Sequence, residues 1–553
     1  MSDNAFDYII VGGGNAGCVL ANRLSQDPAT RVLLLEAGTR ANSLWVGIPA
    51  GFTKLLSTPR HNWLFQTEPE DNTDNRIISI PKGKGLGGST LINGMIYVRG
   101  QPQDYDGWAQ SGARGWSWSD MVPYFEKVER RSGDDGASED GDGVVPIEQV
   151  ASRPEIAEAF IRAGVEAGYP QNADYNGATQ DGFGYYQVNQ HRGRRVSAAD
   201  AYLKPVLNRP NLRLICSAHV TRVVIEGKRA VAVDARVHGR MQRFHADGEV
   251  VLSAGAIQTP QLLELSGIGR PDIVSALGLE VVRPLPSVGE NYVDHFCTRM
   301  SWRVKGTKTL NELTRGLALV RSVAEYAVKR TGILTYATGL AHGFLRTRPG
   351  LAGPDVQLFF MHASYANAAE RKLDKFPGMT IGVSQLRPQS RGSIHAISPD
   401  PMDAPIIRPN FLSAEDDRIC LVDGMKQTRA IMEQPAMTPY REHEIAPGPE
   451  CSSDEDWLAF ARANGQTIYH ASGTCRMGVD PESCVDDRLR LRGIAGLRVV
   501  DASIMPSIVS GNTQAAVFVI AEKGADMILE DWRNGRRSGT NIGGHTTAGG
   551  FDA

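Results

Sequence analysis

Cysteine and histidine are scarce in this 553-residue chain, and neither is spaced for a cross-link or a metal site. The seven cysteines are odd in number and contain no C-x-x-C pair, and the twelve histidines contain no H-x-x-x-H or H-E-x-x-H pattern. Disulfide frameworks and zinc sites both depend on such spacings. We therefore expect a protein of the reducing cytoplasm, without a disulfide framework or a metal ion.

A strong charge and a long apolar run are also missing. The net charge is -3, which provides no general attraction to nucleic acid or to an anionic membrane. The longest apolar runs are interrupted by glycine or are too short to span a bilayer, and a strand predicted from residue 6 leaves no room for a signal peptide. The composition is that of a globular protein, and the length predicts two or more domains.

The most informative stretch that is present covers residues 6–38. The apolar run 8–11 predicts a strand buried on both faces, and it leads directly into GGGNAG at 12–17, which fits G-x-G-x-x-G. A helical pattern follows, and then a second buried strand over 31–35 that ends at Glu36. This order of strand, glycine loop, helix, strand and acid predicts dinucleotide binding.

Each residue type in this motif has a physical role. Gly12 permits the tight turn, Gly14 lets a pyrophosphate approach the backbone, and Gly17 lets the helix pack close to the strand. The start of the helix offers free N–H groups to the phosphates. Glu36 lies 19 residues after Gly17, where it can accept hydrogen bonds from a ribose diol and disfavour the 2′-phosphate of NADP. The motif alone does not separate FAD from NAD.

A second glycine-rich loop over 82–90 favours the larger cofactor. Its glycines again let backbone approach a flat or charged group, and its lysines favour an anion. A nicotinamide enzyme has no obvious need for such a loop. The segment 249–269 repeats the sharp change from strand to helix at a glycine.

Residues 300–450 have a different character and predict a separate α+β unit. We expect a helix over 155–168 with Ile156, Phe160, Ile161 and Val165 facing inward. We also expect a hairpin over 379–398 and a helix that begins after a capping box at Ser413. A further helix is expected to begin near Ser453 with a similar cap.

The chain resembles the glucose-methanol-choline (GMC) family of FAD-dependent oxidoreductases over nearly its whole length. The resemblance is carried by four ordered motifs, at 12–36, 83–93, 255–269 and 469–478, and by a partner segment at 511–513. It implies an α/β fold: a Rossmann-like FAD-binding domain with a discontinuous α+β substrate-binding domain that carries an antiparallel sheet.

The expected FAD-binding domain is itself discontinuous and consists of residues 1–155, 190–300 and 455–540. The substrate-binding domain is expected to consist of residues 156–189 and 301–454. Residues 541–553 are rich in glycine and threonine, and we expect a flexible tail there.

The resemblance also assigns the reacting groups. It implies that His470 is the active-site histidine and that Asn512 is its partner. Alcohol oxidation removes a proton from oxygen and a hydride from carbon, so we expect His470 to act as the base and flavin N5 to accept the hydride. Ile92 replaces the histidine that binds FAD covalently in some members, which predicts non-covalent FAD. The expected cofactor contacts are Gly12, Gly14, Asn15, Ala16, Gly17, Glu36, Gly87, Thr90, Asn93, Gly94, Val220, Asp501, Ala502 and Thr513.

The predicted reaction is the oxidation of a primary alcohol to an aldehyde, with oxygen or a quinone-like compound as the acceptor. No acid that could hold an ammonium group is recognised near 337–344, which puts choline in doubt as the substrate. The alternative is a hydroxynitrile lyase-type enzyme in which FAD is structural. His295 is expected to be a structural histidine with a backbone partner.

Overall fold

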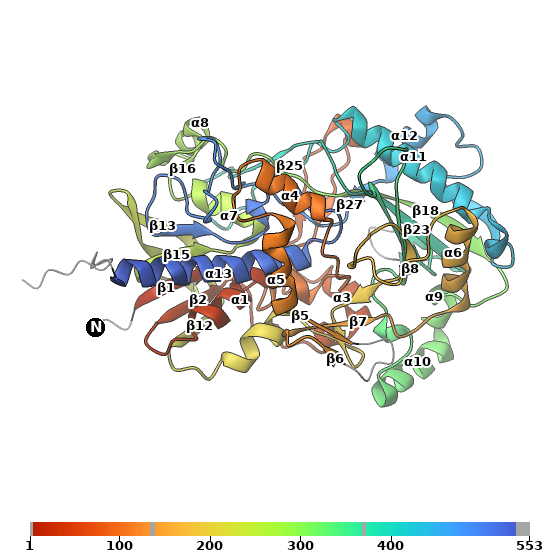
Figure 1. The fold of residues 1–553 in the computed structure, drawn as a ribbon, viewed down its shortest axis with the longest axis horizontal. Coiled ribbons are helices and arrows are strands. Elements are labelled where there is room, and N and C mark those ends of the chain that lie inside the picture. The colour runs from red at the N-terminus through yellow and green to blue at the C-terminus, as the bar shows by residue number, and fades with distance from the viewer. Residues whose placement is uncertain (1–3, 133–138, 368–371, 538–553) are drawn as a thin grey trace, which may run out of the picture.

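The computed structural model describes residues 4–132, 139–367 and 372–537 (Figure 1). The tail expected over 541–553 lies outside these residues. Two seven-stranded sheets form the frame, and Figure 1 shows them in opposite halves of the molecule. This is the mixed α/β architecture expected from the sequence.

The first sheet is built around the motif at the start of the chain. Its apolar strands lie side by side, so that Ile9 pairs with Leu33 on one side and with Val250 on the other. The strands next to β1 are parallel, whereas β13, β14 and β15 form an antiparallel extension. In order, the strands are β12 (Leu212–Cys216), β2 (Val32–Glu36), β1 (Ala5–Val11), β15 (Arg240–Leu252), β14 (Arg229–Val237) and β13 (Ala218–Glu226), with β28 (Leu497–Val499) also on β15.

Two helices from opposite ends of the chain pack together beside this sheet. They are α1 (Asn15–Leu24), which follows the glycine loop, and α13 (Gln514–Arg537). Arg23 of α1 forms ion pairs with Glu522 and Asp526 of α13. The C-terminal segment therefore returns to the dinucleotide motif, as Figure 1 shows for the long blue helix.

The second sheet is antiparallel. One of its faces packs against α6 (Glu155–Glu166) and α11 (Glu415–Met432) in an apolar core that includes Trp302 and Leu358. In order, the strands are β26 (Arg441–Ala446), β18 (Phe296–Val304), β23 (Gly378–Gln385), β20 (Val356–Met361), β19 (Ala341–Leu345) and β8 (Gly182–Tyr185), with β27 (Gln466–Thr467) also on β18.

The predicted hairpin over 379–398 was wrong. Strand β23 pairs with β18 on one edge and with β20 on the other, so neither edge is free for the segment that follows. That segment instead forms β24 (Ser393–His395) with β25 (Ile406–Arg408). Long-range pairing therefore took precedence over the local turn signal.

The predicted helix ends were partly correct. Ser453 caps α12 (Asp454–Asn464) in a capping box with Asp456, as expected. Ser413 does not cap α11, which begins after Ala414 without a side-chain cap. Val165 is 43% exposed rather than inward-facing, because the last turn of α6 faces the core through Ala163 and Gly164 instead.

The remaining helices surround this frame. They are α2 (Leu44–Gly47), α3 (Phe52–Leu55), α4 (Pro102–Gln110), α5 (Trp118–Val128), α7 (Gly255–Glu264), α8 (Pro271–Ala276), α9 (Leu310–Leu313) and α10 (Gly316–Lys329). Within the described residues, none of the helices has the length and apolar character needed to cross a bilayer.

The domain bounds given above stay a prediction. Strand β8 belongs to the second sheet although it precedes most of that sheet in sequence, as a discontinuous unit requires. Strand β18 crosses the predicted bound at residue 300, and β27 comes from the segment assigned to FAD binding. The sheet boundary and the predicted bounds therefore differ at these two places.

Candidate active site

The glycine loop after β1 has the geometry that its sequence predicts. Gly12 has a φ of +102°, and a Cβ atom there would lie 2.5 Å from the carbonyl oxygen of Ser253. A Cβ on Gly17 would lie 1.9 Å from the carbonyl oxygen of Gly12, so only glycine allows this contact between helix and loop. A Cβ on Gly14 would meet nothing closer than 3.9 Å, which leaves space beside the start of α1.

Glu36 connects three glycine-containing segments at the end of β2. Its carboxylate accepts hydrogen bonds from the backbone N–H groups of Gly13 (2.8 Å), Gly38 (2.7 Å) and Gly85 (3.0 Å). Burial raises the pKa of Glu36, and the three amides oppose that rise. Each carboxylate oxygen has two lone pairs, so Oε2 keeps one for a ribose hydroxyl.

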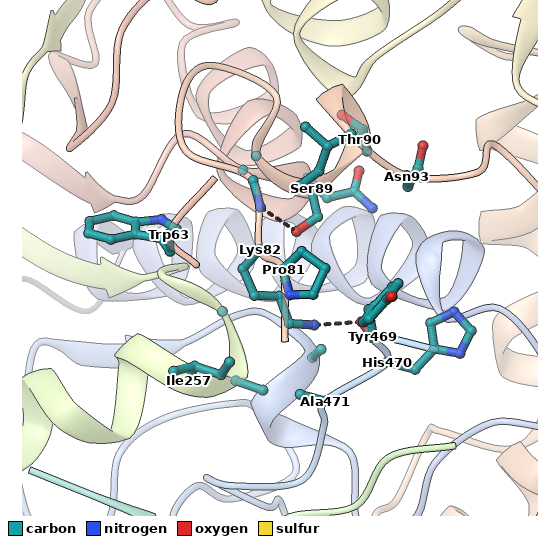
Figure 2. A pocket seen from close by; sticks show the side chains of 18 of the residues that line it. Trp63, Pro81, Lys82, Ser89, Thr90, Asn93, Ile257, Tyr469, His470 and Ala471 are labelled. Carbon is teal, nitrogen blue, oxygen red and sulfur yellow. Dashed lines mark hydrogen bonds between the residues drawn. The ribbon is translucent and has the colours of Figure 1, made fainter. Parts of the chain in front are cut away.

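A cavity of about 350 Å³ lies at the carboxyl ends of β1, β2 and β15, where open α/β sheets bind ligands. It extends from the start of α1 to His470, and Figure 2 shows residues from distant parts of the chain around it. Of the predicted site residues, Gly17 and Gly87 do not line the cavity. Those that line it are Gly12, Gly14, Asn15, Ala16, Glu36, Thr90, Asn93, Gly94, Val220, His470, Asp501, Ala502, Asn512 and Thr513.

The residues around this cavity fit FAD. Two buried oxygens of the wall, Asn15 Oδ1 and Ser253 Oγ, have no hydrogen-bond partner within the protein. Buried polar atoms are normally paired, so these two indicate a polar ligand. Gly14 supplies the space for a pyrophosphate and Glu36 the acceptor for a ribose, and the cavity continues to a histidine.

His470 belongs to a chain of hydrogen bonds that determines which of its nitrogens carries hydrogen. His295 Nε2 lies 3.0 Å from the carbonyl oxygen of Leu386, which can only accept, so His295 carries its hydrogen on Nε2. The bare Nδ1 of His295 therefore accepts from Nδ1–H of His470, 2.9 Å away. Nε2 of His470 therefore carries no hydrogen and can accept one.

Asn512 lies on the other side of the same ring. Its Nδ2 is 3.2 Å from Nε2 of His470, and its Oδ1 accepts from Nε2 of Gln357 at 3.3 Å. The amide is thereby oriented with its N–H toward the histidine. The structure thus brings together His470 and Asn512, the two residues that the family resemblance assigns as partners.

His295 and His470, the two histidines joined by these hydrogen bonds, are both neutral near pH 7. Burial, and next the neighbouring His295 and Lys82, lower the pKa of His470 well below 6.5. Burial lowers the pKa of His295 to about 4. A neutral imidazole with an unprotonated Nε2 is the form that accepts a proton.

The backbone around His470 is held by buried charged groups. Its N–H donates to Oδ1 of Asp294 at 2.8 Å, and Lys82 Nζ donates to the carbonyl oxygen of Tyr469 at 2.6 Å (Figure 2). Burial lowers the pKa of Lys82, and Asp294 opposes that shift. These contacts place the imidazole at the cavity wall independently of its own side-chain bonds.

The second sheet supplies the wall near His470. One face of its strands presents Cys297 and Arg299 from β18, and Arg299 pairs in register with Gly382 of β23, which has no side chain. Among the described residues, Arg299 has no hydrogen-bond or ion-pair partner, so its positive charge has no direct partner in that part of the chain. The other lining residues of this sheet are Phe359, Met361 and Thr380.

Three residues of the site did not stand out in the sequence. His295 has the backbone partner expected of a structural histidine, but it also contacts His470. Lys82 was noted only as a basic residue, and Arg299 not at all. The alternation of polar and apolar residues along 299–304 is the signal that would have placed Arg299 opposite Met300 and Trp302, on the face of Cys297.

The fold and the cavity define a flavin-dependent oxidoreductase. A GMC oxidoreductase family model matches residues 6–297, and a second GMC oxidoreductase model matches residues 388–521. The chain therefore belongs to the GMC oxidoreductases. It is an FAD-dependent enzyme that acts on the CH–OH group of its donors.

Individual relatives match this chain over almost its full length. The chain is 41% identical to an alcohol dehydrogenase [acceptor] of Pseudomonas putida, covering 95% of this chain and 96% of that protein. It is 40% identical to the mitochondrial choline dehydrogenase of Homo sapiens, covering 95% and 90%. Among solved structures, pyridoxine 4-oxidase from Mesorbium loti has a TM-score of 0.85 at 31% identity, covering 95% of this chain and 99% of the other.

Proposed function

We propose that this enzyme oxidises a primary alcohol to an aldehyde and that Nε2 of His470 takes the hydroxyl proton. The observation that carries the proposal is the hydrogen-bond chain from Leu386 through His295, which leaves Nε2 unprotonated at the cavity wall. When bound, FAD supplies the hydride acceptor at its N5 atom. The amide N–H of Asn512 points toward Nε2 of His470 and stabilises the substrate oxygen as that oxygen becomes negative.

The proposed substrate is uncharged or anionic rather than a quaternary ammonium compound. Arg299 lines the same cavity as His470, and its guanidinium forms no ion pair with a carboxylate of the described residues, whereas Lys82 has the neighbouring carboxylate of Asp294. A cationic substrate would be repelled there. Choline is therefore not our proposed substrate, although choline dehydrogenases are among the relatives.

The cofactor is proposed to be held without a covalent bond. Ile92 lines the cavity and has no nucleophilic atom. We propose oxygen or a quinone-like compound as the acceptor. We also propose a cytoplasmic location, because all seven cysteines are free.

Anaerobic mixing with a panel of aliphatic, aromatic and carboxylate-bearing alcohols tests the reaction. The flavin absorbance should bleach with an alcohol if the enzyme oxidises it, whereas a lyase with structural FAD would leave it unchanged. His470→Ala should slow bleaching by at least about 100-fold with the FAD content retained. His443→Ala, a change at an exposed histidine, is the control. Rapid bleaching in His470→Ala would remove this residue from the reaction.

A further inference from the structure

Helix α10 carries its apolar side chains on the side that faces away from the protein. Only Ser322 and Tyr326 of its 14 residues are buried. Leu317 is 88% exposed, Val328 83% and Val320 64%. At 3.6 residues per turn, these three side chains lie on the face opposite Tyr326. An ordinary surface helix has the reverse pattern, with polar residues outward.

The helix projects from the edge of the molecule. Figure 1 shows α10 at the margin of the half that contains the second sheet. Its main attachment is near its C-terminal end, where the Tyr326 hydroxyl donates to the carbonyl oxygen of Gly193 at 3.1 Å. Contiguous exposed apolar side chains of this kind mark an interaction surface.

Basic residues are concentrated along this helix. Between residues 315 and 330 there are four basic side chains and one acidic side chain, Glu325, so this segment has a net charge of +3 while the whole chain has -3. The basic residues are Arg315, Arg321, Lys329 and Arg330, and all four are exposed. Arg315 donates to the carbonyl oxygen of Asp374 and Arg330 stacks on Tyr326, whereas Arg321 and Lys329 have no hydrogen bond or ion pair with another described residue and lie beside the apolar face. Apolar residues bordered by lysine and arginine are typical of helices that lie in the interface of an anionic membrane.

Further exposed apolar side chains lie nearby, on the N-terminal part of the chain. Gly193 and Arg194 lie between α10 and α2, because Gly193 contacts Arg330 and the Arg194 guanidinium contacts Gly47. Helix α2 exposes two further apolar side chains, Leu44 (76%) and Trp45 (46%). Tryptophan is favoured at the membrane–water interface because its ring is amphipathic.

We propose that α10, together with Leu44 and Trp45, docks this enzyme onto the surface of a bilayer that contains anionic lipid. A second copy of the chain is a poorer occupant, because a two-fold interface at α10 would place two segments of net charge +3 against each other. Anionic head groups instead neutralise these charges while the apolar side chains enter the acyl boundary.

The docked orientation would bring lipid close to one wall of the cavity. The turn Ile333–Thr335 follows α10 and packs against the turn Pro49–Gly51. Phe52, Leu56 and Thr338, which flank these two turns in sequence, line the cavity. An apolar alcohol or acceptor dissolved in the bilayer would therefore have a short path to the site.

Sedimentation of the FAD-loaded full chain with vesicles tests this surface. The enzyme should sediment at low salt with vesicles of phosphatidylcholine and phosphatidylglycerol, and less with phosphatidylcholine alone. The double variant Leu317→Ser, Val328→Ser should reduce the partition coefficient by about tenfold or more, and Arg321→Glu by about tenfold, because a charge reversal removes one attraction and adds one repulsion. Met241→Ser changes a side chain that is 57% exposed in the other half of the molecule and should have no effect.

The replaced side chains are all solvent-exposed. The FAD content of each variant and its turnover of a water-soluble alcohol should therefore match those of the wild type. The proposal is overturned if the wild-type enzyme stays in the supernatant with the anionic vesicles, or if the double variant sediments as the wild type does. Light scattering that shows a dimer dissociated by the double variant would also overturn it, because the face would then be a contact between copies.

Discussion

Replacing His295 by leucine tests whether the hydrogen-bond chain keeps His470 in its proton-accepting form. The substitution removes the acceptor that lies 2.9 Å from Nδ1 of His470. The Nδ1–H group would then be buried without a partner, and the other tautomer, with hydrogen on Nε2, would become favoured. That tautomer cannot take a proton from the alcohol.

The size of the effect follows from the cost of an unpaired buried donor. Leaving such a group unsatisfied costs about 1–3 kcal/mol. At 1.36 kcal/mol per tenfold change in rate, His295→Leu should slow flavin reduction by roughly 5- to 150-fold. His295→Asn should recover much of this loss, because an asparagine amide oxygen can occupy nearly the same position as Nδ1 of histidine.

Anaerobic stopped-flow reduction of the flavin measures this step without interference from the acceptor. The FAD content of each variant is measured first, so that loss of cofactor is not mistaken for slow chemistry. His362→Leu is the control, since His362 is also a buried histidine but is not bonded to His470. If His295→Leu reduces flavin at the wild-type rate, or if His295→Asn is as slow as His295→Leu, the tautomer argument fails.

Three further predictions concern the cofactor site and the stability of the fold. Gly17→Ala should destabilise the protein or abolish FAD binding, because its Cβ would lie 1.9 Å from the carbonyl oxygen of Gly12; a thermal melt and a flavin spectrum equal to those of the wild type would contradict this. Two carboxylates, including that of Glu264 at 2.7 Å, oppose the effect of burial and raise the pKa of His395 to about 9. Because this pKa is raised on folding, the associated stability should be complete below about pH 6.5 and lost as the pH rises through 9, with an upper limit of about 3.4 kcal/mol. His395→Gln should flatten this part of the denaturation profile, and an unchanged slope would exclude the ion pair as its source. Finally, acid precipitation should release all of the FAD, since Ile92 offers no atom for a covalent link; flavin that stays in the pellet would show a bond elsewhere.

The sequence alone was enough to predict the parts of the molecule that depend on backbone geometry. A strand, a turn at positive φ and a close contact between helix and loop each require particular residues at fixed spacing, so Gly12, Gly17 and Glu36 identify the dinucleotide unit. The family signatures likewise predict that His470 and Asn512 are partners, and the two side chains lie 3.2 Å apart.

Tertiary structure decided which side chains meet. The partner of His470 on its other side lies 175 residues away, and no local pattern distinguishes that histidine from an ordinary buried one. The predicted hairpin failed for the same reason, since both edges of β23 pair with strands distant in sequence. The outward apolar face of α10 is visible only once Tyr326 is known to face inward. Backbone constraints act between neighbouring residues, whereas side-chain contacts depend on how whole strands and helices pack, and that packing is a property of the complete chain.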